Sequence, residues 1–600
     1  MADLTSLGAA VRRLSRRRAV WLGGLGAVLL TLAVLVPVVL ANIDEVSTAP
    51  SEPVHHLVFR AGRSASRARV ARTRTRPAPA LPSAAVTIDA ALRSTPVPSS
   101  YFGISTEYWE LPLFERDTPA FERLLALLHV PGDGPLILRI GGDSADQSFW
   151  SPRRAKMPGW AFAVTPSYVS RLRALVLRDR VKLIVDLNLV TATPLTAAAW
   201  ARAAETELPH GSIIGFEIGN EPDLYSRTHW IAMVDRSPFE VRSLPFELTP
   251  AGYVQDFAAY ARVLGENAPD IPLVGPAVAH PRFSLPFIST LIADQRPELG
   301  MVTGHLYPYS ACVKDQRSGA YPTVARVLSP QATSAFFSDI ASAVAVAHRA
   351  GLKFRLTEFN SVTCGGKAGV SNTFATALWA PDALFTAMRT GADGANLHIH
   401  AGPWSGAFAI NAAFAIYHSG LQARPLLYGL MLFTRTLGPQ ARLVSLHLNA
   451  ARSLNLSAWA VEVKDRILHV LLIDKGSRTA RVYLRLPASA TGTVERLLAP
   501  SAYARSQVTL NGQQLNSAAE WTGTPRTETV APVGRDRYEI TLYRRSAALM
   551  SVQLASGPRA VPARGRGNVS KHAKPSKHHR RVAVAKHAVL AVGLDRPRKH

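Results

Sequence analysis

The chain has 600 residues, of which 47% are apolar, so it is long enough for a large core and for more than one domain. Its formal net charge of +26 would suggest a nucleic-acid partner if it covered a folded surface, but the charge is concentrated at the two ends. Residues 1–84 have a net charge of +8 and residues 558–600 a net charge of +11, which leaves +7 for the middle. We therefore expect no specific nucleic-acid binding.

A basic segment, residues 1–18, precedes residues 19–41, a run of 23 residues without a charge. As a helix, this run is long enough to cross a bilayer core of roughly 30 Å, and the arginines before it are expected to stay on the cytoplasmic side. The sequence predicts an uncleaved membrane anchor, or else a signal peptide that is cleaved near Ala41. Both alternatives place the rest of the chain outside the cytoplasm. Residues 42–84, rich in Pro, Ser, Ala and Arg, predict a disordered linker.

Eight strand-like runs then alternate with helical stretches. The predicted strands are 101–107, 136–141, 181–188, 213–219, 271–276, 301–307, 353–359 and 395–400. The predicted helices are 119–129, 166–180, 195–207, 250–267, 286–294, 330–350, 372–390 and 421–436. Alternating strands and helices require parallel strand pairing with right-handed crossovers. Eight such repeats predict a (β/α)8 barrel, the TIM barrel, over residues 99–437.

After residue 437 the pattern changes to short alternating strands, which we place at 443–448, 458–463, 467–473, 480–486, 494–498 and 538–543. Such strands without long helices between them predict an antiparallel β-sandwich over residues 438–554. We expect residues 85–98, which precede the barrel, to contribute a strand to this sandwich. Residues 555–600 predict a disordered basic tail.

Two glutamates end predicted barrel strands. Glu221, in the stretch Gly-Asn-Glu-Pro, closes strand four, and Glu358 lies near the end of strand seven. Barrel enzymes carry their chemistry at this end of the strands. Two carboxyl groups facing one another there are what glycoside hydrolysis needs, one as the acid and the other as the nucleophile. Asn220 is expected to bind a sugar hydroxyl, and Tyr307 is expected to donate to Glu358.

Simpler interpretations of these residues remain open. Glu221 could lie in a surface turn, Tyr307 could be a tyrosine at the edge of the core, and Glu358 could serve only as the partner of a buried arginine such as Arg139.

The motifs around these residues resemble those of glycoside hydrolase family 79, the heparanase and β-glucuronidase family. The resemblance covers about residues 85–547. Asn220-Glu221-Pro222 is common to the whole clan of retaining barrel glycosidases. More specific are Leu138–Gly142 (Leu-Arg-Ile-Gly-Gly), His305–Tyr307 (His-Leu-Tyr), and the segment from Thr357 through Gly365-Gly366 to Ser371 and Thr373–Ala375.

The resemblance implies a β-glucuronidase-type activity with Glu221 as acid/base and Glu358 as nucleophile. It implies that backbone amides of Cys364, Gly365 and Gly366 hold the uronate carboxylate. It further implies sugar contacts from Glu107 and from Asp143, where the family has threonine; Trp404, where the chain also departs from the family, is a candidate wall of the sugar site.

The chain has only two cysteines, Cys312 and Cys364, each five residues beyond a predicted strand end. The loops after strands six and seven are neighbours in a barrel, so we expect a disulfide that braces the carboxylate-binding loop. Two buried thiols are the alternative. The sequence offers no metal motif and no nucleotide loop, so no cofactor is expected.

The sequence thus predicts a secreted or membrane-anchored retaining glycosidase that acts on a glucuronide or another uronic-acid glycan. A xylosidase or arabinofuranosidase of the same clan is the enzymatic alternative. A surface glycan-binding protein without turnover is the non-enzymatic alternative.

Overall fold

The computed structural model describes residues 80–89, 91–115, 118–153, 157–227, 248–400, 407–410 and 421–555. The predicted membrane segment 19–41 and the segments 1–18, 42–79 and 556–600 lie outside the described residues, as does Trp404. Within the described ranges, no helix has both the length and the apolar character needed to cross a bilayer.

The barrel predicted from the sequence is present. Its strands are β3 (Phe102–Glu107), β4 (Ile137–Gly141), β7 (Lys182–Leu187), β8 (Ile213–Ile218), β9 (Leu273–Val278), β10 (Leu299–Leu306), β12 (Lys353–Phe359) and β14 (Gly394–Ile399). Each strand pairs in parallel with its neighbours in chain order, and β14 pairs with β3 to close the ring. The strands are buried on nearly all their length, as parallel strands covered by helices are.

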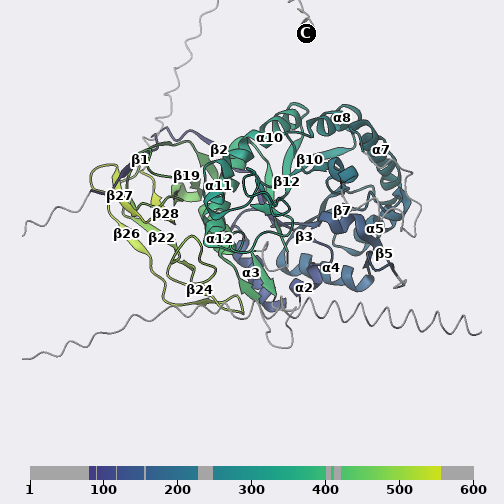
Figure 1. Cartoon of the computed structure of the whole chain (residues 1–600), viewed down its shortest axis with the longest axis horizontal. Coiled ribbons are helices and arrows are strands. Elements are labelled where there is room, and N and C mark those ends of the chain that lie inside the picture. The colour runs from purple at the N-terminus through teal and green to yellow at the C-terminus, as the bar shows by residue number, and fades with distance from the viewer. Residues whose placement is uncertain are drawn as a thin grey trace, which may run out of the picture. The chain divides into compact units, whose positions relative to one another are not determined.

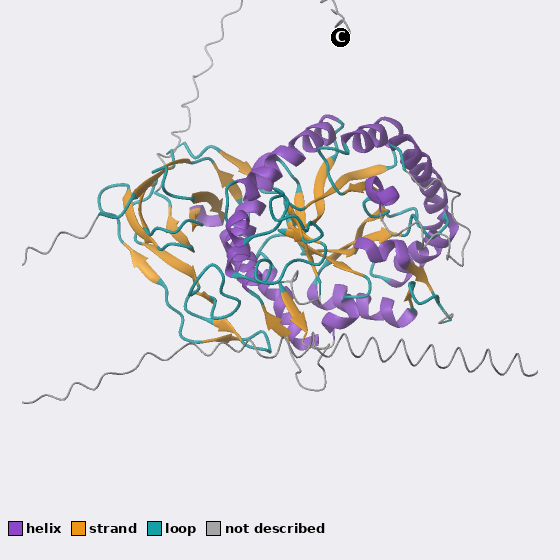
Figure 2. Cartoon of the chain, in the orientation of Figure 1, coloured by secondary structure: helices purple, strands orange, loops and turns teal. Residues whose placement is uncertain are grey.

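Helices surround these strands, as the purple ribbons around the orange barrel in Figure 2 show. They are α3 (Thr118–Leu128), α4 (Pro166–Asp179), α5 (Pro194–Glu207), α7 (Pro250–Asn267), α8 (Leu285–Gln295), α10 (Gln331–Arg349), α11 (Phe374–Thr390) and α12 (Pro425–Thr436). Several can be followed in Figure 1.

A Thr-Pro pair sets the first residue of three of these helices. Thr165, Thr193 and Thr249 cap α4, α5 and α7, and each hydroxyl accepts a hydrogen bond from a backbone N–H in the first turn. The proline that follows takes the first helical position, where its missing N–H costs nothing. Helix α12 differs from the prediction because it begins at Pro425, while Leu421–Ala423 form strand β16 against β15 (Phe408–Ile410).

The C-terminal domain is a two-sheet sandwich with its own apolar core. One sheet has the order β18 (His447–Ala450), β1 (Ser83–Thr87), β21 (Ala480–Arg485) and β27 (Arg537–Leu542). The other has the order β2 (Ser94–Pro96), β17 (Arg442–Val444), β19 (Leu456–Val463), β20 (Ile467–Asp474), β28 (Ser546–Gln553), β22 (Gly492–Leu498) and β23 (Thr509–Leu510).

The strand expected before the barrel is β1, and it lies between β18 and β21 of the sandwich. The β1–β21 pair is parallel, whereas the other sandwich pairs are antiparallel. The single strand predicted at 443–448 is wrong in detail, because β17 and β18 belong to different sheets. Strand β28, in the middle of its sheet, was not predicted.

A buried polar cluster joins α11 of the barrel to the sandwich. The carboxylate of Asp382 accepts hydrogen bonds from Trp459 Nε1 (2.9 Å), Ser457 Oγ (2.9 Å) and Lys475 Nζ (2.6 Å). The side chains of Asp382 and Lys475 are 4% and 1% exposed, so each charge depends on the other for compensation. An apolar core that contains residues of both α11 and β19 continues around this cluster.

Candidate active site

The two predicted glutamates meet at the carboxyl-terminal end of the barrel strands. Glu221 follows β8 after Gly219 and Asn220, and both Gly219 (φ 77°) and Glu221 (φ 51°) have left-handed backbone conformations. This tight turn brings Glu221 back over the barrel, where its backbone N–H donates to the carbonyl of Ala277. One carboxylate oxygen of Glu221, one of Glu358 and a ring nitrogen of His305 all lie within 4.8 Å of one another.

Glu358 is held as a carboxylate. Tyr307 Oη donates to its Oε1 at 2.7 Å, as predicted, and Arg139 Nη1 donates to its Oε2 at 2.7 Å. Burial by itself would raise the pKa of Glu358, but His398, His305, Arg139 and the Tyr307 hydroxyl together lower this pKa far below its usual range. Hydrogen bonds on both oxygens hold the carboxylate in place. The side chain is 10% exposed, so it still reaches the opening of the barrel.

Glu221 has the opposite tendency. The pKa of Glu221 is raised to about 7, mainly by burial and also by the negative charge of Glu358, although the hydrogen bond and charge of His305 act against this. His305 Nδ1 lies 2.9 Å from Glu221 Oε1, and the Glu221 side chain is 21% exposed. The two carboxyl groups therefore differ in protonation near neutral pH, one largely ionised and the other ready to hold a proton.

Arg139 organises the floor beneath Glu358. Its fully buried guanidinium forms ion pairs with Glu358 (2.7 Å), Glu217 (2.7 Å) and Asp186 (2.8 Å). It also donates to Asn220 Oδ1 at 3.0 Å. Glu358 therefore does pair with the buried Arg139, as the simpler interpretation stated. This pairing occupies only one oxygen of Glu358, and the other oxygen accepts the hydrogen bond from Tyr307.

The sequence reasoning did not single out Glu217 or Asp186. Each is a charged residue with apolar residues on both sides, in Ile-Ile-Gly-Phe-Glu-Ile of β8 and in Lys-Leu-Ile-Val-Asp-Leu of β7. A buried charge in such a strand requires a partner, and this signal could have pointed to Arg139.

The other predicted sugar-binding residues surround the pair. Asn220 Nδ2 lies 3.4 Å from Asp143 Oδ1, and Glu107 Oε2 accepts from the backbone N–H of Ser144 at 2.8 Å. Burial, together with the nearby charge of Asp143, raises the pKa of Glu107 to about 8. Glu107, Asp143 and Asn220 come from three different strand ends, so the barrel brings together what the sequence separates.

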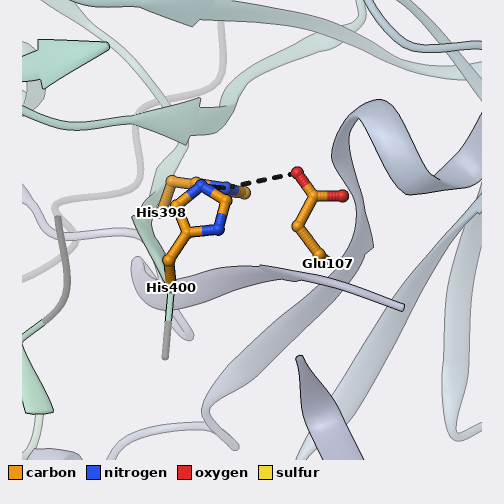
Figure 3. A group of neighbouring side chains, drawn as sticks. All are labelled: Glu107, His398 and His400. Carbon is orange, nitrogen blue, oxygen red and sulfur yellow. Dashed lines mark hydrogen bonds and ion pairs between the residues drawn. The ribbon is translucent and has the colours of Figure 1, made fainter. Parts of the chain in front are cut away.

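The sequence analysis missed two histidines, His398 in β14 and His400 directly after that strand. His398 and His400 are two positions apart, so they lie on the same side of the strand. Their Nε2 atoms are 3.1 Å apart, and His398 Nε2 lies 3.7 Å from Glu107 Oε1 (Figure 3). His-Ile-His at the end of a predicted barrel strand was the available signal.

The loop after β12 carries the predicted disulfide and the glycine pair. Cys312 and Cys364 form a disulfide, with Cα atoms 5.8 Å apart, which confirms that prediction. The short strands β11 (Tyr309–Ser310) and β13 (Val362–Thr363) pair just before the two cysteines. Cys364, Gly365 and Gly366 all have positive φ angles, a conformation that glycine adopts at little cost.

Two groups of side chains at the site could hold a cation. One is Glu221, His305 and Glu358, and the other is Glu107, His398 and His400. In the first group Arg139 already neutralises Glu358, and this group contains the predicted reacting carboxylates. A separate cavity of about 760 Å³ lies at the other end of the barrel, lined by residues around Pro135, Lys182 and Ser212, where β4, β7 and β8 begin.

Comparison with known proteins agrees with this geometry. A family model described as the glycosyl hydrolase family 79 C-terminal beta domain matches residues 413–549. A 4-O-α-L-rhamnosyl-β-D-glucuronidase from Fusarium oxysporum 12S has a similar structure, with a TM-score of 0.61 and 19% identity over 78% of this chain and 100% of that chain. No curated protein sequence matches the chain.

Two further solved structures have the same fold at lower similarity. The family 51 α-L-arabinofuranosidase AbfB from Bifidobacterium longum has a TM-score of 0.56 at 15% identity, over 79% of this chain and 100% of that one. The family 44 endoglucanase Cel44A from Clostridium thermocellum has a TM-score of 0.52 at 14% identity, with the same coverage. At such identities the likeness concerns the fold, a barrel with a β domain, whereas the family model is specific. The chain thus resembles glycoside hydrolase family 79 through its C-terminal domain, residues 413–549, and its overall fold is shared with the glycosidases named above.

Proposed function

We propose that the protein is a retaining β-glucuronidase-type hydrolase in which Glu221 is the acid/base and Glu358 the nucleophile. The observation that carries this proposal is that one carboxylate oxygen of Glu221 and one of Glu358 lie within 4.8 Å of one another. Retaining glycosidases have their carboxyl groups about 5–5.5 Å apart, whereas inverting enzymes leave about 6.5–9.5 Å for a water molecule. So close an approach of one oxygen from each group favours the retaining class.

In the first step, Glu221 donates its proton to the glycosidic oxygen while Glu358 attacks the anomeric carbon. Arg139 and Tyr307 hold Glu358 ionised and aimed, so little reorganisation is needed. The bond between the sugar and the leaving group breaks, and an ester bond between the sugar and Glu358 forms.

In the second step, Glu221 removes a proton from water, which attacks the anomeric carbon and releases Glu358. The charge of Glu358 is absent while it is esterified, and this charge contributes to the raised pKa of Glu221. The pKa of Glu221 therefore falls when the intermediate forms, which suits its change from acid to base.

A uronic-acid sugar is supported by the family and by the loop at Cys364–Gly366. Successive backbone N–H groups in left-handed conformations form concave sites that suit anions, and Gly365 and Gly366 present no side chain in the way. The similar Fusarium protein is a glucuronidase by name. The similar fold of an arabinofuranosidase keeps a neutral pentose as the second candidate.

The purified full chain tests this choice with aryl glycosides that carry glucuronide, xyloside, arabinofuranoside or glucoside groups. We expect the β-glucuronide to give the highest kcat/KM, and NMR of the first product to show the β anomer. Preferred hydrolysis of a neutral glycoside would remove the uronate assignment, and an initial α anomer would remove the retaining mechanism.

We also propose that the enzyme works outside the cytoplasm. The Cys312–Cys364 disulfide is typical of oxidising compartments, and the uncharged segment 19–41 suits an anchor or a signal peptide. Protease treatment of intact cells is expected to degrade the catalytic domain or to find it released into the medium. Full protection inside intact cells would contradict this location.

A further inference from the structure

Three acceptor atoms converge beside the nucleophile. They are Nε2 of His398, Nε2 of His400 and Oε1 of Glu107, and all lie within 4.8 Å of one another (Figure 3). The two nitrogens are 3.1 Å apart, and the carboxylate oxygen is 3.7 Å from the nitrogen of His398. Glu107 and His398 are almost completely buried, so these atoms must find partners within the protein.

The outer partners of the histidines favour unprotonated Nε2 atoms. His400 Nδ1 lies 3.5 Å from Glu110 Oε1, and His398 Nδ1 lies 3.4 Å from Glu358 Oε2 and 3.1 Å from Ser105 Oγ. A carboxylate can only accept, so each Nδ1 is the better place for the ring proton. Without an ion, one Nε2 must carry a proton to make the 3.1 Å contact between the two rings. An ion would replace that proton and take both Nε2 lone pairs together with the Glu107 oxygen.

We propose that Glu107, His398 and His400 form a binding site for one divalent first-row transition metal ion, with Zn²⁺ as its representative. Two imidazoles and one carboxylate are a ligand set that such metals prefer over Mg²⁺ or Ca²⁺. Metal–ligand distances of about 2.0–2.2 Å allow one ion to reach atoms that are 3–4 Å apart. Within the described residues Glu107 forms no ion pair with a lysine or arginine, so a metal that displaces its proton would become its counter-charge.

The outer shell matches that of known metal sites. Metal-binding histidines donate their second N–H to a carboxylate or another acceptor, which fixes the ring. Glu110 and Glu358 provide these carboxylates here, and the backbone N–H of Ser144 holds the second oxygen of Glu107. The His400 side chain is 25% exposed, which gives an ion a route to the site.

Three protein ligands leave a fourth coordination position open for water or a substrate hydroxyl. Because His398 also faces the nucleophile Glu358, this position lies beside the sugar ring. The contact with a hydroxyl rests on the proposed function, whereas binding of the metal does not. The ion is expected to lower KM more than it raises kcat, because it binds a hydroxyl of the sugar that is away from the bond that breaks.

The full chain, stripped with a chelator and then dialysed, is titrated with ZnCl₂ by calorimetry and with CoCl₂ by visible absorption. We expect one tight site per chain and cobalt bands of a four- or five-coordinate ion. His400→Ala and Glu107→Gln should each weaken this binding at least tenfold, the lower end of what loss of one ligand or its supporting contact costs.

Two controls separate this site from other histidines. His348, exposed on α10 and paired with Asp393, becomes the variant His348→Ala. The second control is the double variant His578→Ala/His579→Ala in the basic tail, because neighbouring histidines there could bind zinc by themselves. Both controls should keep the tight site.

Equal binding by His400→Ala and the unsubstituted chain, or loss of the tight site in the tail variant, would overturn the proposal. So would the absence of any stoichiometric site, in which case a proton shared by the two histidines replaces the metal. A chain that binds zinc at these residues yet hydrolyses no glucuronide would leave the metal site standing and remove the proposed substrate.

Discussion

The hydroxyl of Tyr307 and the guanidinium of Arg139 give Glu358 its ionised state, one on each oxygen. A nucleophile in a buried site needs such support, because burial alone would favour its neutral, unreactive form. Glu221, a few ångströms away, lacks an arginine contact among the described residues and keeps its proton more readily. The division of roles thus follows from the neighbours of each carboxyl group.

Tyr307→Phe removes one of these supports without changing the shape of the side chain. The hydroxyl lowers the pKa of Glu358, so its loss should raise that pKa and bring the acidic limb of the kcat/KM profile to higher pH. A hydrogen bond to a charged group contributes about 1.5–3 kcal/mol, so we expect kcat to fall about tenfold to a hundredfold.

Tyr309→Phe is the matched control, since its hydroxyl donates to the carbonyl of Arg326 instead. It should leave the pH profile unchanged. An unshifted acidic limb in Tyr307→Phe would show that this hydroxyl does not tune the nucleophile.

His305→Gln tests the role of Glu221 as the acid, through the alkaline limb of the kcat/KM profile. Activity should decline as the pH rises through about 7, where Glu221 loses the proton that it must donate. His305 lowers the pKa of Glu221, so its replacement should raise that pKa further and move the alkaline limb to higher pH.

His469→Gln, a substitution of a sandwich histidine bonded to the carbonyl of Thr436, is the control for the pH profile. If the alkaline limb moved to lower pH in His305→Gln, Glu221 could not be the group that titrates there.

At the scale of elements, strand ends place the reacting groups and paired loops hold them. Strands β8, β10, β12 and β14 supply Glu221, Tyr307, Glu358 and His400 at or just beyond their ends. These residues are far apart in the chain, and only closure of the barrel brings them together. The strand periodicity sufficed to predict the meeting of Glu221, Tyr307 and Glu358, because the carboxyl ends of parallel strands share one rim.

The ion pairs in the barrel interior, below that rim, could not be predicted in the same way. Arg139 was considered as an ordinary partner of Glu358, but its simultaneous pairing with Glu217 and Asp186 depends on side chains crossing the barrel interior. The sequence indicates that such buried charges need partners without indicating which ones. The pair His398 and His400 is different, since period-two spacing on β14 already placed both on one side.

Loss of the Cys312–Cys364 disulfide should loosen the loop at Gly365. The bond closes a segment with a sequence separation of 52, for which the chain-entropy model gives about 4 kcal/mol of stabilisation. In Cys312→Ser/Cys364→Ser we expect a lower melting temperature and, for a glucuronide, a rise in KM larger than the change in kcat. An unchanged KM for the glucuronide would separate this loop from carboxylate binding.

At the scale of the whole molecule, two features join the barrel to the sandwich. Strand β1 enters the sandwich before the barrel begins, and α11 of the barrel meets β19 and Lys475 through Asp382. A strand outside the barrel was predicted within residues 85–98, and β1, Ser83–Thr87, begins two residues earlier. Strand β28 was missed because Ser546–Gln553, with Ala-Ala-Leu-Met in its middle, has a single β-branched residue, Val552, and none of the aromatic residues that mark strands.

Asp382→Ala should destabilise this junction strongly. It leaves the buried ammonium of Lys475 without a counter-charge, which costs about 3–5 kcal/mol. Asp536→Ala removes the partner of Arg485 in an exposed ion pair and should cost less than about 1 kcal/mol. Chemical denaturation of the two variants compares them directly, and similar losses would mean that the junction does not depend on the buried pair.

The most direct test of the account is the position of a covalent intermediate. The full chain is incubated with a 2-deoxy-2-fluoro-β-D-glucuronyl fluoride, whose fluorine slows release of the sugar from the enzyme, and is then digested and mapped by mass spectrometry. The account predicts one glucuronyl group per chain, on Glu358, with Glu358→Gln left unlabelled. A label on Glu221 or Glu107, or hydrolysis of the substrate with inversion and no label at all, would contradict it.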